Sequence, residues 1–160
     1  MKKLVCLNFT ALIFTLAFTF SSYSQAVVPP EVSKYISQRA KIEDADEYPD
    51  ARKIVKTDMN GDRKSDLVVL YTLEGFGGGN AHRQYIAVFL SKGNRYALSV
   101  NEVVGGKLNR DVELKRVVGK SIYLTTLGYG KNDGGCCPSV KGKTRYVYSN
   151  GRLTEKRWVG

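Results

Sequence analysis

The sequence has little of the two residue types on which most catalytic and metal centres depend. Only three cysteines and one histidine occur among its 160 residues. A cysteine nucleophile needs an imidazole base that a third group orients, and the sequence shows no such group for His82. The adjacent thiols of Cys136 and Cys137 suit a tetrahedral zinc site poorly. The sequence therefore predicts no catalytic residues and no enzyme.

Long apolar runs are equally scarce, because only residues 4–20 form one. Lys2 and Lys3 precede this run, and the small residues of Ser24-Gln25-Ala26 follow it. This order predicts a signal peptide over residues 1–26, cleaved after Ala26, with a retained membrane anchor as the alternative. No later run is long enough to cross a bilayer. We therefore expect a mature chain without a transmembrane span, in the periplasm or secreted from the cell.

Acidic residues are outnumbered, with 15 against 25 basic residues and a net charge of +10. Removing residues 1–26 takes away two lysines and leaves 23 basic against 15 acidic residues, a net charge of +8. Such a balance favours anionic surroundings such as lipid head groups, envelope polymers or an acidic protein. The basic residues are scattered, so a solvated surface is the alternative. An exported chain without a recognition helix or stacking motif predicts no nucleic-acid partner.

One helix and about seven strands are predicted for the mature chain. Pro29 and Pro30 open a segment in which apolar residues recur at helical spacing, namely Val32, Tyr35, Ile36 and Ala40. The acidic stretch 43–50 predicts a loop. Short apolar or alternating runs then predict strands at Leu67–Leu73, Gln84–Leu90, Tyr96–Val103, Val112–Val118, Ser121–Leu127, Thr144–Ser149 and Arg152–Trp158.

Turn signals between these runs predict how the strands connect. Gly93-Asn94, Gly119-Lys120 and Asn150-Gly151 each favour a two-residue hairpin turn. Consecutive hairpins indicate an antiparallel meander rather than a parallel α/β sheet. The runs 67–71 and 85–90 are apolar at successive positions, so we expect central strands covered on both faces, with the helix on one of them. The predicted fold is a single mainly β (α+β) domain over residues 27–160.

An acidic loop that leads into the first central strand is the clearest motif. It reads Asp58-Met59-Asn60-Gly61-Asp62-Arg63-Lys64-Ser65-Asp66. Calcium requires oxygen atoms at alternate positions of one tight loop. The predicted ligands are the side chains of Asp58, Asn60, Asp62 and Asp66 and the backbone carbonyl of Lys64. The spacing and the following strand resemble the calcium loop of FG-GAP repeats, the units of integrin-type propellers, here in a single copy.

Two cations in this loop weaken the predicted calcium site. Arg63 stands where the FG-GAP pattern has glycine, and Lys64 follows it. Each cation about 8 Å from a divalent ion costs about 1 kcal/mol even in a water-like dielectric. We therefore expect weak, structural calcium binding. The alternative is a capped turn in which the loop carboxylates accept backbone hydrogen bonds and Asp66 pairs with Arg63 or Lys64.

Two loops rich in glycine predict a binding surface. The first, residues 74–82, joins the central strands and holds four glycines, and the second spans residues 128–139. An exposed aromatic side chain on a mobile loop often marks a contact surface, with folding over the edge of the sheet as the alternative for Phe76. The predicted surface residues are Phe76, Asn80, His82, Asn132, Asp133 and Ser139.

Cys136 and Cys137 are the two cysteines that remain after removal of the signal peptide. An exported compartment oxidises thiols, so a vicinal disulfide is predicted. Adjacent α-carbons lie about 3.8 Å apart, whereas relaxed disulfides span about 4.4–6.8 Å, so such a bridge is strained and comparatively reducible. Buried free thiols and an intermolecular bridge are the alternatives.

The signal peptide, acidic loop, glycine-rich hairpin and Cys136-Cys137-Pro138-Ser139 segment together resemble small exported bacterial proteins of unassigned function. The resemblance implies fold and location and carries no activity. The sequence leaves two hypotheses. The first is a non-enzymatic binding module for an envelope component or a partner protein, with calcium as a weak structural ion. The second is a thiol-dependent redox protein or enzyme that uses the cysteine pair.

Overall fold

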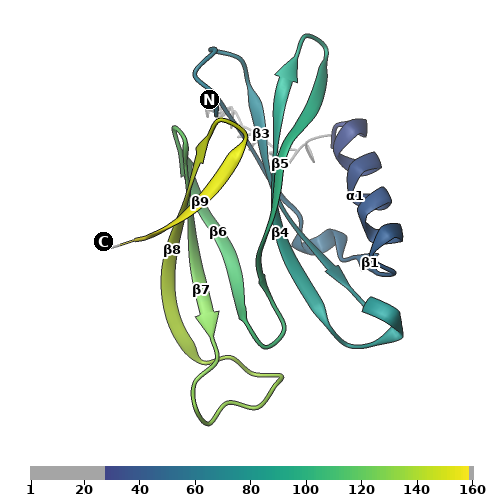
Figure 1. Cartoon of the computed structure of the whole chain (residues 1–160), viewed down its shortest axis with the longest axis vertical. Helices are drawn as coiled ribbons and strands as arrows, with labels where there is room; N and C mark the ends of the chain where they lie inside the picture. The colour runs from purple at the N-terminus through teal and green to yellow at the C-terminus, as the bar shows by residue number, and fades with distance from the viewer. Residues whose placement is uncertain (1–27, 159–160) are drawn as a thin grey trace, which may run out of the picture.

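A computed structural model describes residues 28–158, so the predicted signal peptide lies outside the described residues. The described chain forms one antiparallel sheet of nine strands with one α-helix, which confirms the predicted mainly β meander (Figure 1). Its elements are α1 Pro30–Ile42, β1 Asp46–Glu47, η1 Pro49–Ala51, β2 Lys53–Thr57, β3 Asp66–Glu74, η2 Phe76–Gly78, β4 His82–Lys92, β5 Arg95–Gly106, β6 Arg110–Val118, β7 Ser121–Gly128, β8 Val140–Ser149 and β9 Arg152–Arg157. Strands β3 to β9 follow one another across the sheet, and β1 and β2 both pair with β3.

Strands β1 and β2 are absent from the sequence prediction. β1 has only two residues and lies within the stretch 43–50 that was predicted to be a loop. β2 pairs with β3 over five residues, from Lys53 opposite Leu70 to Thr57 opposite Asp66. Neither strand has a long apolar or alternating run. Pairing with the buried β3, rather than their own sequence pattern, makes these segments extended.

The central strands β3 and β4 are buried on both faces, as predicted. Side chains alternate between the faces of a strand, and the two sets belong to two separate cores. One core lies under α1 and contains Val69, Tyr71, Tyr85 and Phe89 together with Val32, Ile36 and Ala40 of the helix. The other contains Val68, Leu70, Ile86 and Val88 together with Val112, Ile122, Leu124, Tyr146 and Tyr148 of β6, β7 and β8.

The second core exists because the sheet folds back on itself between β5 and β6. Figure 1 shows β6 to β9 facing β3 to β5, with α1 on the far side of β3 to β5. The fold-back passes through Gly105 and Gly106, and a Cβ at Gly106 would lie 2.6 Å from the carbonyl oxygen of His82. Real Cβ atoms do not approach so closely, so the backbones can come this near to each other only because these residues lack side chains.

Two partly exposed networks of hydrogen bonds and ion pairs connect the elements of this arrangement. Glu43, after the end of α1, accepts hydrogen bonds from the Tyr85 hydroxyl at 2.6 Å and from Arg83 at 2.9 Å, and it also pairs with Arg39. Arg110 donates to the carbonyl of Val104, to the Tyr146 hydroxyl and to Glu155. Arg110 thereby ties β5, β6, β8 and β9 together at the fold-back.

Candidate functional site

The concave face of the folded sheet is apolar along most of its length and polar at one end. On β3 the residues that face this side are Val68, Leu70, Thr72 and Glu74, and on β4 they are Val88, Ile86, Gln84 and His82. The alternation of a strand places every second residue on the same face. The apolar core therefore gives way to polar side chains at the end of the β3–β4 hairpin.

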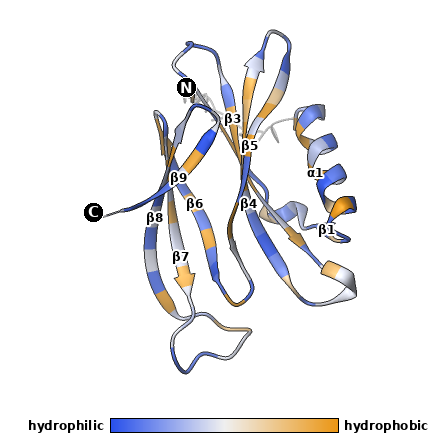
Figure 2. Cartoon of the chain, viewed as in Figure 1, coloured by the Kyte–Doolittle hydropathy of each residue, from blue (hydrophilic) through white to orange (hydrophobic). Residues whose placement is uncertain are grey.

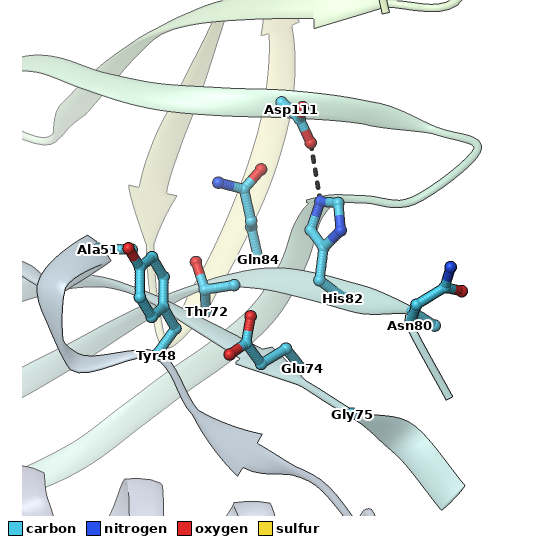
Figure 3. Close-up of a pocket in the computed structure, with 10 residues that line it drawn as sticks. Tyr48, Ala51, Thr72, Glu74, Gly75, Asn80, His82, Gln84 and Asp111 are labelled. Atoms are coloured by element: carbon cyan, nitrogen blue, oxygen red, sulfur yellow. Dashed lines mark hydrogen bonds and ion pairs between the residues drawn. The ribbon is translucent and has the colours of Figure 1, made fainter. Parts of the chain in front are cut away.

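These polar side chains line a hollow of about 510 Å³. The side chains of Tyr48, Thr72, Glu74, Gln84 and His82 point toward the same space in Figure 3. The other lining residues are Ala51, Gly75, Asn80, Ala81 and Asp111. The hollow presents two carboxylates, two hydroxyl groups and two carboxamides, so it suits a polar ligand rather than an apolar one.

His82 and Asp111 form a hydrogen-bonded pair in this hollow. The Nε2 atom of His82 lies 2.8 Å from Oδ1 of Asp111, a hydrogen bond that joins β4 to β6 (Figure 3). A carboxylate partner fixes the orientation of an imidazole ring. The sequence showed no orienting partner for His82, because Asp111 lies 29 residues further along the chain.

Gln84 holds β6 in place beside this pair. Its side-chain carbonyl accepts a hydrogen bond from the amide of Val112 at 2.7 Å, and its amide group donates to the carbonyl of Val112 at 3.0 Å. β4 and β6 are not neighbours in the sheet, so these two hydrogen bonds link strands that have no backbone pairing with each other. Both polar groups of the Gln84 side chain are bound to Val112, the residue that follows Asp111. Gln84 therefore holds the backbone beside Asp111 in position.

A second hollow of about 330 Å³ adjoins the first and shares three residues with it, Asn80, His82 and Asp111. The remaining lining residues come from Lys107 and from the second predicted loop, at Tyr129, Gly135 and Cys136. Asn80 also accepts a hydrogen bond from the ammonium group of Lys107. The structure therefore brings loops 74–82 and 128–139 to one place, with His82 and Asp111 between them.

The loop 128–139 is braced by its own hydrogen bonds. The carboxylate of Asp133 accepts from the amide of Gly130 at 2.7 Å and from the amide and hydroxyl of Ser139 at 2.9 Å. These bonds, that from Gly130 foremost, lower the pKa of Asp133 below its ordinary value. Asp133 and Ser139 therefore shape the loop, while Asn132 is exposed on it.

The predicted vicinal disulfide is present on this loop. The sulfur atoms of Cys136 and Cys137 are bonded to each other, and both residues are exposed. Cys136 lines the second hollow together with His82. The bridge therefore stands at the edge of the candidate site and not in a core.

Phe76 lies away from both hollows. Its ring is partly buried against the core under α1, and the guanidinium group of Arg83 lies 4.5 Å from the ring centroid. The amide of Gly77 donates to the carbonyl of Asp44, which holds η2 against the segment that follows α1. Phe76 therefore folds over the edge of its own sheet, which was the alternative to an exposed contact residue.

The acidic loop 58–66 is arranged as a capped turn. Asp58 accepts hydrogen bonds from the amides of Gly61 and Arg63 at 2.7 and 2.8 Å. Asn60 and Asp62 each accept one from the amide two residues further on, both at 2.9 Å. The backbone bonds from Gly61 and Arg63 lower the pKa of Asp58 below its ordinary value.

Asp66 has a different position from the other predicted calcium ligands. It is fully buried, and its two oxygens accept from the amides of Met59 and Ser91, both at 2.8 Å. The alternative pairing of Asp66 with Arg63 or Lys64 is therefore wrong, because both carboxylate oxygens are taken by backbone amides. In the described part of the chain, no group of three or more His, Cys, Asp or Glu side chains is arranged to hold a metal ion. Calcium binding by this loop stays a prediction.

Sequence reasoning missed Tyr48, Thr72, Glu74, Gln84 and Asp111 as site residues. The alternation of β3 and β4 gave a signal, because polar residues interrupt an apolar face at positions 72 and 74 and at 82 and 84. Nothing in the sequence indicated Tyr48 or Asp111, which come from segments that the fold-back and β1 bring to the same end of the sheet.

Comparison of the chain with protein-family models, with curated proteins and with solved structures found no match. Among residues 28–158, no helix has both the length and the apolar character needed to cross a membrane. The fold and the site geometry are therefore the grounds on which a function is inferred.

Proposed function

We propose that this protein is a non-enzymatic binding module that acts in the periplasm or outside the cell. Its ligand binds in the two adjoining hollows at the polar end of the concave face. The observation that carries this proposal is the meeting of loops 74–82 and 128–139 around the shared residues Asn80, His82 and Asp111. A rigid sheet that presents two loops around one concavity is a common way to build a binding site.

The chemistry of the hollows restricts the ligand. Glu74 and Asp111 bring negative charge, and Tyr48, Thr72 and Asn80 bring groups that form hydrogen bonds. Such a lining favours a ligand that presents hydrogen-bond donors or a cationic group. An envelope component with amine or hydroxyl groups fits this description, and so does a basic segment of a partner protein.

Capture of the ligand from envelope fractions tests this proposal. The mature domain would be immobilised and its captured components quantified by mass spectrometry, alongside the variants Glu74→Gln and Asn80→Ala. We expect each variant to lose about tenfold in affinity for the specific ligand, as when one buried hydrogen bond to a charged group is lost. Glu102→Gln is the matched control, because Glu102 is exposed on the neighbouring β5. Equal capture by all four proteins would overturn the proposal.

A second candidate function is thiol–disulfide exchange at Cys136 and Cys137. The observation in its favour is that Cys136 lines the same hollow as His82, which Asp111 orients. In this reaction a substrate dithiol attacks the bridge and His82 accepts the proton of the attacking thiol. Two electrons and two protons pass to the cysteines, which leaves a substrate disulfide and two cysteine thiols.

Thiol counting separates the two functions. The measurement is the number of alkylated cysteines in protein taken from its native compartment, and the rate at which a model dithiol reduces the bridge. Exchange chemistry predicts a fraction of reduced protein and a rate that falls at least tenfold in His82→Ala. An equal rate in the wild type and in His82→Ala would reject this candidate and leave the binding proposal unaffected.

A further inference from the structure

The outer face of β6 to β9 carries basic side chains at regular intervals. Lys141, Lys143 and Arg145 occupy alternate positions of β8, so they share one face at intervals of about 6.8 Å. Arg145 lies opposite Tyr123 of β7 on one side and opposite Lys156 of β9 on the other. Arg116 of β6 lies opposite Tyr123 from the other side. Basic residues therefore extend both along β8 and across the sheet, and Figure 2 shows the hydrophilic bands of β8.

Aromatic rings hold part of this charge in place. The guanidinium carbon of Arg116 lies 4.8 Å from the ring centroid of Tyr123 and 5.9 Å from that of Trp158. The ammonium nitrogen of Lys143 lies 5.1 Å from the Trp158 ring, and the two rings meet edge to face at 5.1 Å. The electron-rich faces of the rings attract the cations and offset their mutual repulsion. Arg116 and Lys143 are thus held close together before any ligand arrives.

A shallow hollow of about 550 Å³ continues this surface along the sheet. Its lining includes Lys115, Lys141 and Lys143 together with Thr125 and Leu127. Gly142 lies between the two lysines along β8, but its Cα faces Thr126 on the other side of the strand, so Lys141 and Lys143 are neighbours on the outer face. The hollow is therefore a trough with cations along it and a hydroxyl group at its base. Both acidic side chains that line it have partners, Glu113 with Lys115 at 2.9 Å and Asp111 with His82 at 2.8 Å.

We infer that this surface, the basic face formed by Arg116, Lys141, Lys143, Arg145, Lys156 and Trp158, binds a linear anionic polysaccharide. A polymer with a carboxylate or sulfate group on successive sugars presents negative charges along one direction, as β8 presents positive ones. Thr125 and the aromatic edges offer contacts for sugar hydroxyl and C–H groups. None of the six residues of the basic face lines the hollows of the concave face, although Asp111 borders both those hollows and the trough beside the basic face.

Trp158 provides a direct readout, because it is the one tryptophan of the chain. The mature domain would be titrated with polygalacturonate while tryptophan fluorescence is recorded, with neutral dextran as the comparison polymer. We expect saturable quenching or a spectral shift with polygalacturonate and none with dextran. The logarithm of the affinity should fall linearly with the logarithm of the salt concentration, since bound counterions are released.

Charge-removal variants test whether the basic face is responsible. Lys141→Gln and Lys156→Gln each remove an exposed cation, and they leave in place Arg116 and Lys143, the cations that lie over the Trp158 ring. Each should lower the affinity about fivefold, the effect of one contact charge pair in water, and lower the salt slope by about one charge. Lys34→Gln is the matched control, because Lys34 is exposed on α1, on the far side of the sheet. Calorimetry would repeat the measurement without the fluorophore.

Three results would overturn the inference. The first is equal binding of dextran and polygalacturonate, and the second is an equal loss of affinity in Lys34→Gln and Lys141→Gln. The third is tighter binding of anionic lipid vesicles or of single-stranded DNA than of polygalacturonate at the same salt concentration, which would assign the basic face to another class of partner. None of these results depends on the ligand of the concave face.

Discussion

At the residue scale, the aspartates that the sequence singled out in the loops 58–66 and 128–139 accept hydrogen bonds from backbone amides. Asp58, Asp66 and Asp133 each accept amide hydrogen bonds within their loops or from a neighbouring strand. The sequence correctly marked these residues as unusual, because acidic and small polar residues cluster where chains turn. It could not show whether an oxygen faces an ion or an amide, since the same spacing of oxygens serves both.

Calcium titration decides between these roles for the loop 58–66. A bound ion stabilises the folded domain by about 1.4 kcal/mol at a free concentration tenfold above Kd, which raises Tm by a few degrees. The weak range expected for extracellular sites, about 10⁻⁴–10⁻³ M, requires titration to about 10 mM, with magnesium as the control. Asp62→Asn should abolish the rise. If calcium did not change the melting curve and Asp58→Ala still destabilised the protein, only the capped-turn interpretation would remain.

Glu43 gives a prediction for the dependence of stability on pH. Burial by itself raises the pKa of this carboxyl, but the hydrogen bond from Tyr85 and the charge of Arg39 outweigh burial, and the net effect lowers it. The same contact and burial raise the pKa of Tyr85 to about 12. A carboxyl whose folded pKa is lowered stabilises the fold above its unfolded pKa of about 4.3, and this stabilisation is lost as the pH falls through the folded value.

The measurement is urea denaturation of the wild type and Glu43→Gln between pH 7 and pH 3. At pH 7 the variant should be less stable by about 2 kcal/mol, because the charged partner of Tyr85, Arg83 and Arg39 is gone. The difference should shrink as the pH falls below about 4.3. Glu102→Gln serves as the exposed control and should follow the wild-type curve. A difference that stays constant down to pH 3 would show that Glu43 acts through packing and not through its charge.

At the scale of elements, hairpins were predictable and the fold-back was not. The Asn150-Gly151 pair predicted a tight turn, and both residues have positive φ, with Ser149 pairing with Arg152 across it. The type of a tight turn depends on the two residues at its centre, so it can be predicted from adjacent positions in the sequence. The close approach of β5 to its neighbours depends instead on Gly105 lying against the carbonyl of Arg110 and Gly106 against that of His82, and Gly105-Gly106 alone gives no indication of these partners.

Gly106 should therefore be sensitive to substitution. It has a φ of +146°, and an added Cβ would lie 2.6 Å from the carbonyl oxygen of His82. Gly106→Ala is expected to destabilise the fold by about 2–4 kcal/mol, since both a backbone strain and a clash must be relieved. Denaturation midpoints measure the loss, and the NMR signals of the His82 ring should move because the strand beneath it shifts.

Gly119→Asn is the comparison for this prediction. Gly119 also has a positive φ, +51°, but nothing lies within 4 Å of an added Cβ. Asn tolerates this backbone region better than other residues, so a loss within about 1 kcal/mol is expected. If the two variants were equally destabilised, backbone conformation alone would explain the sensitivity of Gly106, and the close approach to the carbonyl of His82 would not be needed.

At the scale of the whole molecule, the two cores and the candidate site are located in different parts of the fold. The two cores lie on opposite faces of β3 and β4, whereas the disulfide and the loop 128–139 project from the end of the sheet (Figure 1). The sequence predicted both loops of the concave site but not their meeting. That meeting depends on the fold-back, which no local pattern encodes.

Reduction of the disulfide should therefore leave global stability almost unchanged. A cross-link stabilises a protein chiefly by shortening the loops available to the unfolded chain, and this effect grows with the length of the closed loop. Cys136 and Cys137 are adjacent, so their bridge closes the shortest loop a chain can have. Both are exposed and belong to neither core. We expect reduction to change Tm by less than about 2 °C.

Thermal melting with and without a phosphine reductant tests this expectation, with Cys136→Ser and Cys137→Ser combined in one variant as the permanent form of the reduced state. Ile122→Ala is the positive control, because Ile122 is fully buried and its truncation should cost about 3 kcal/mol. Amide NMR signals should change on reduction only in residues 128–139 and around His82, which faces Cys136 across the second hollow. A fall in Tm comparable to that of Ile122→Ala would place the bridge among the elements that hold the fold, and would make the loop a structural unit rather than part of a binding site.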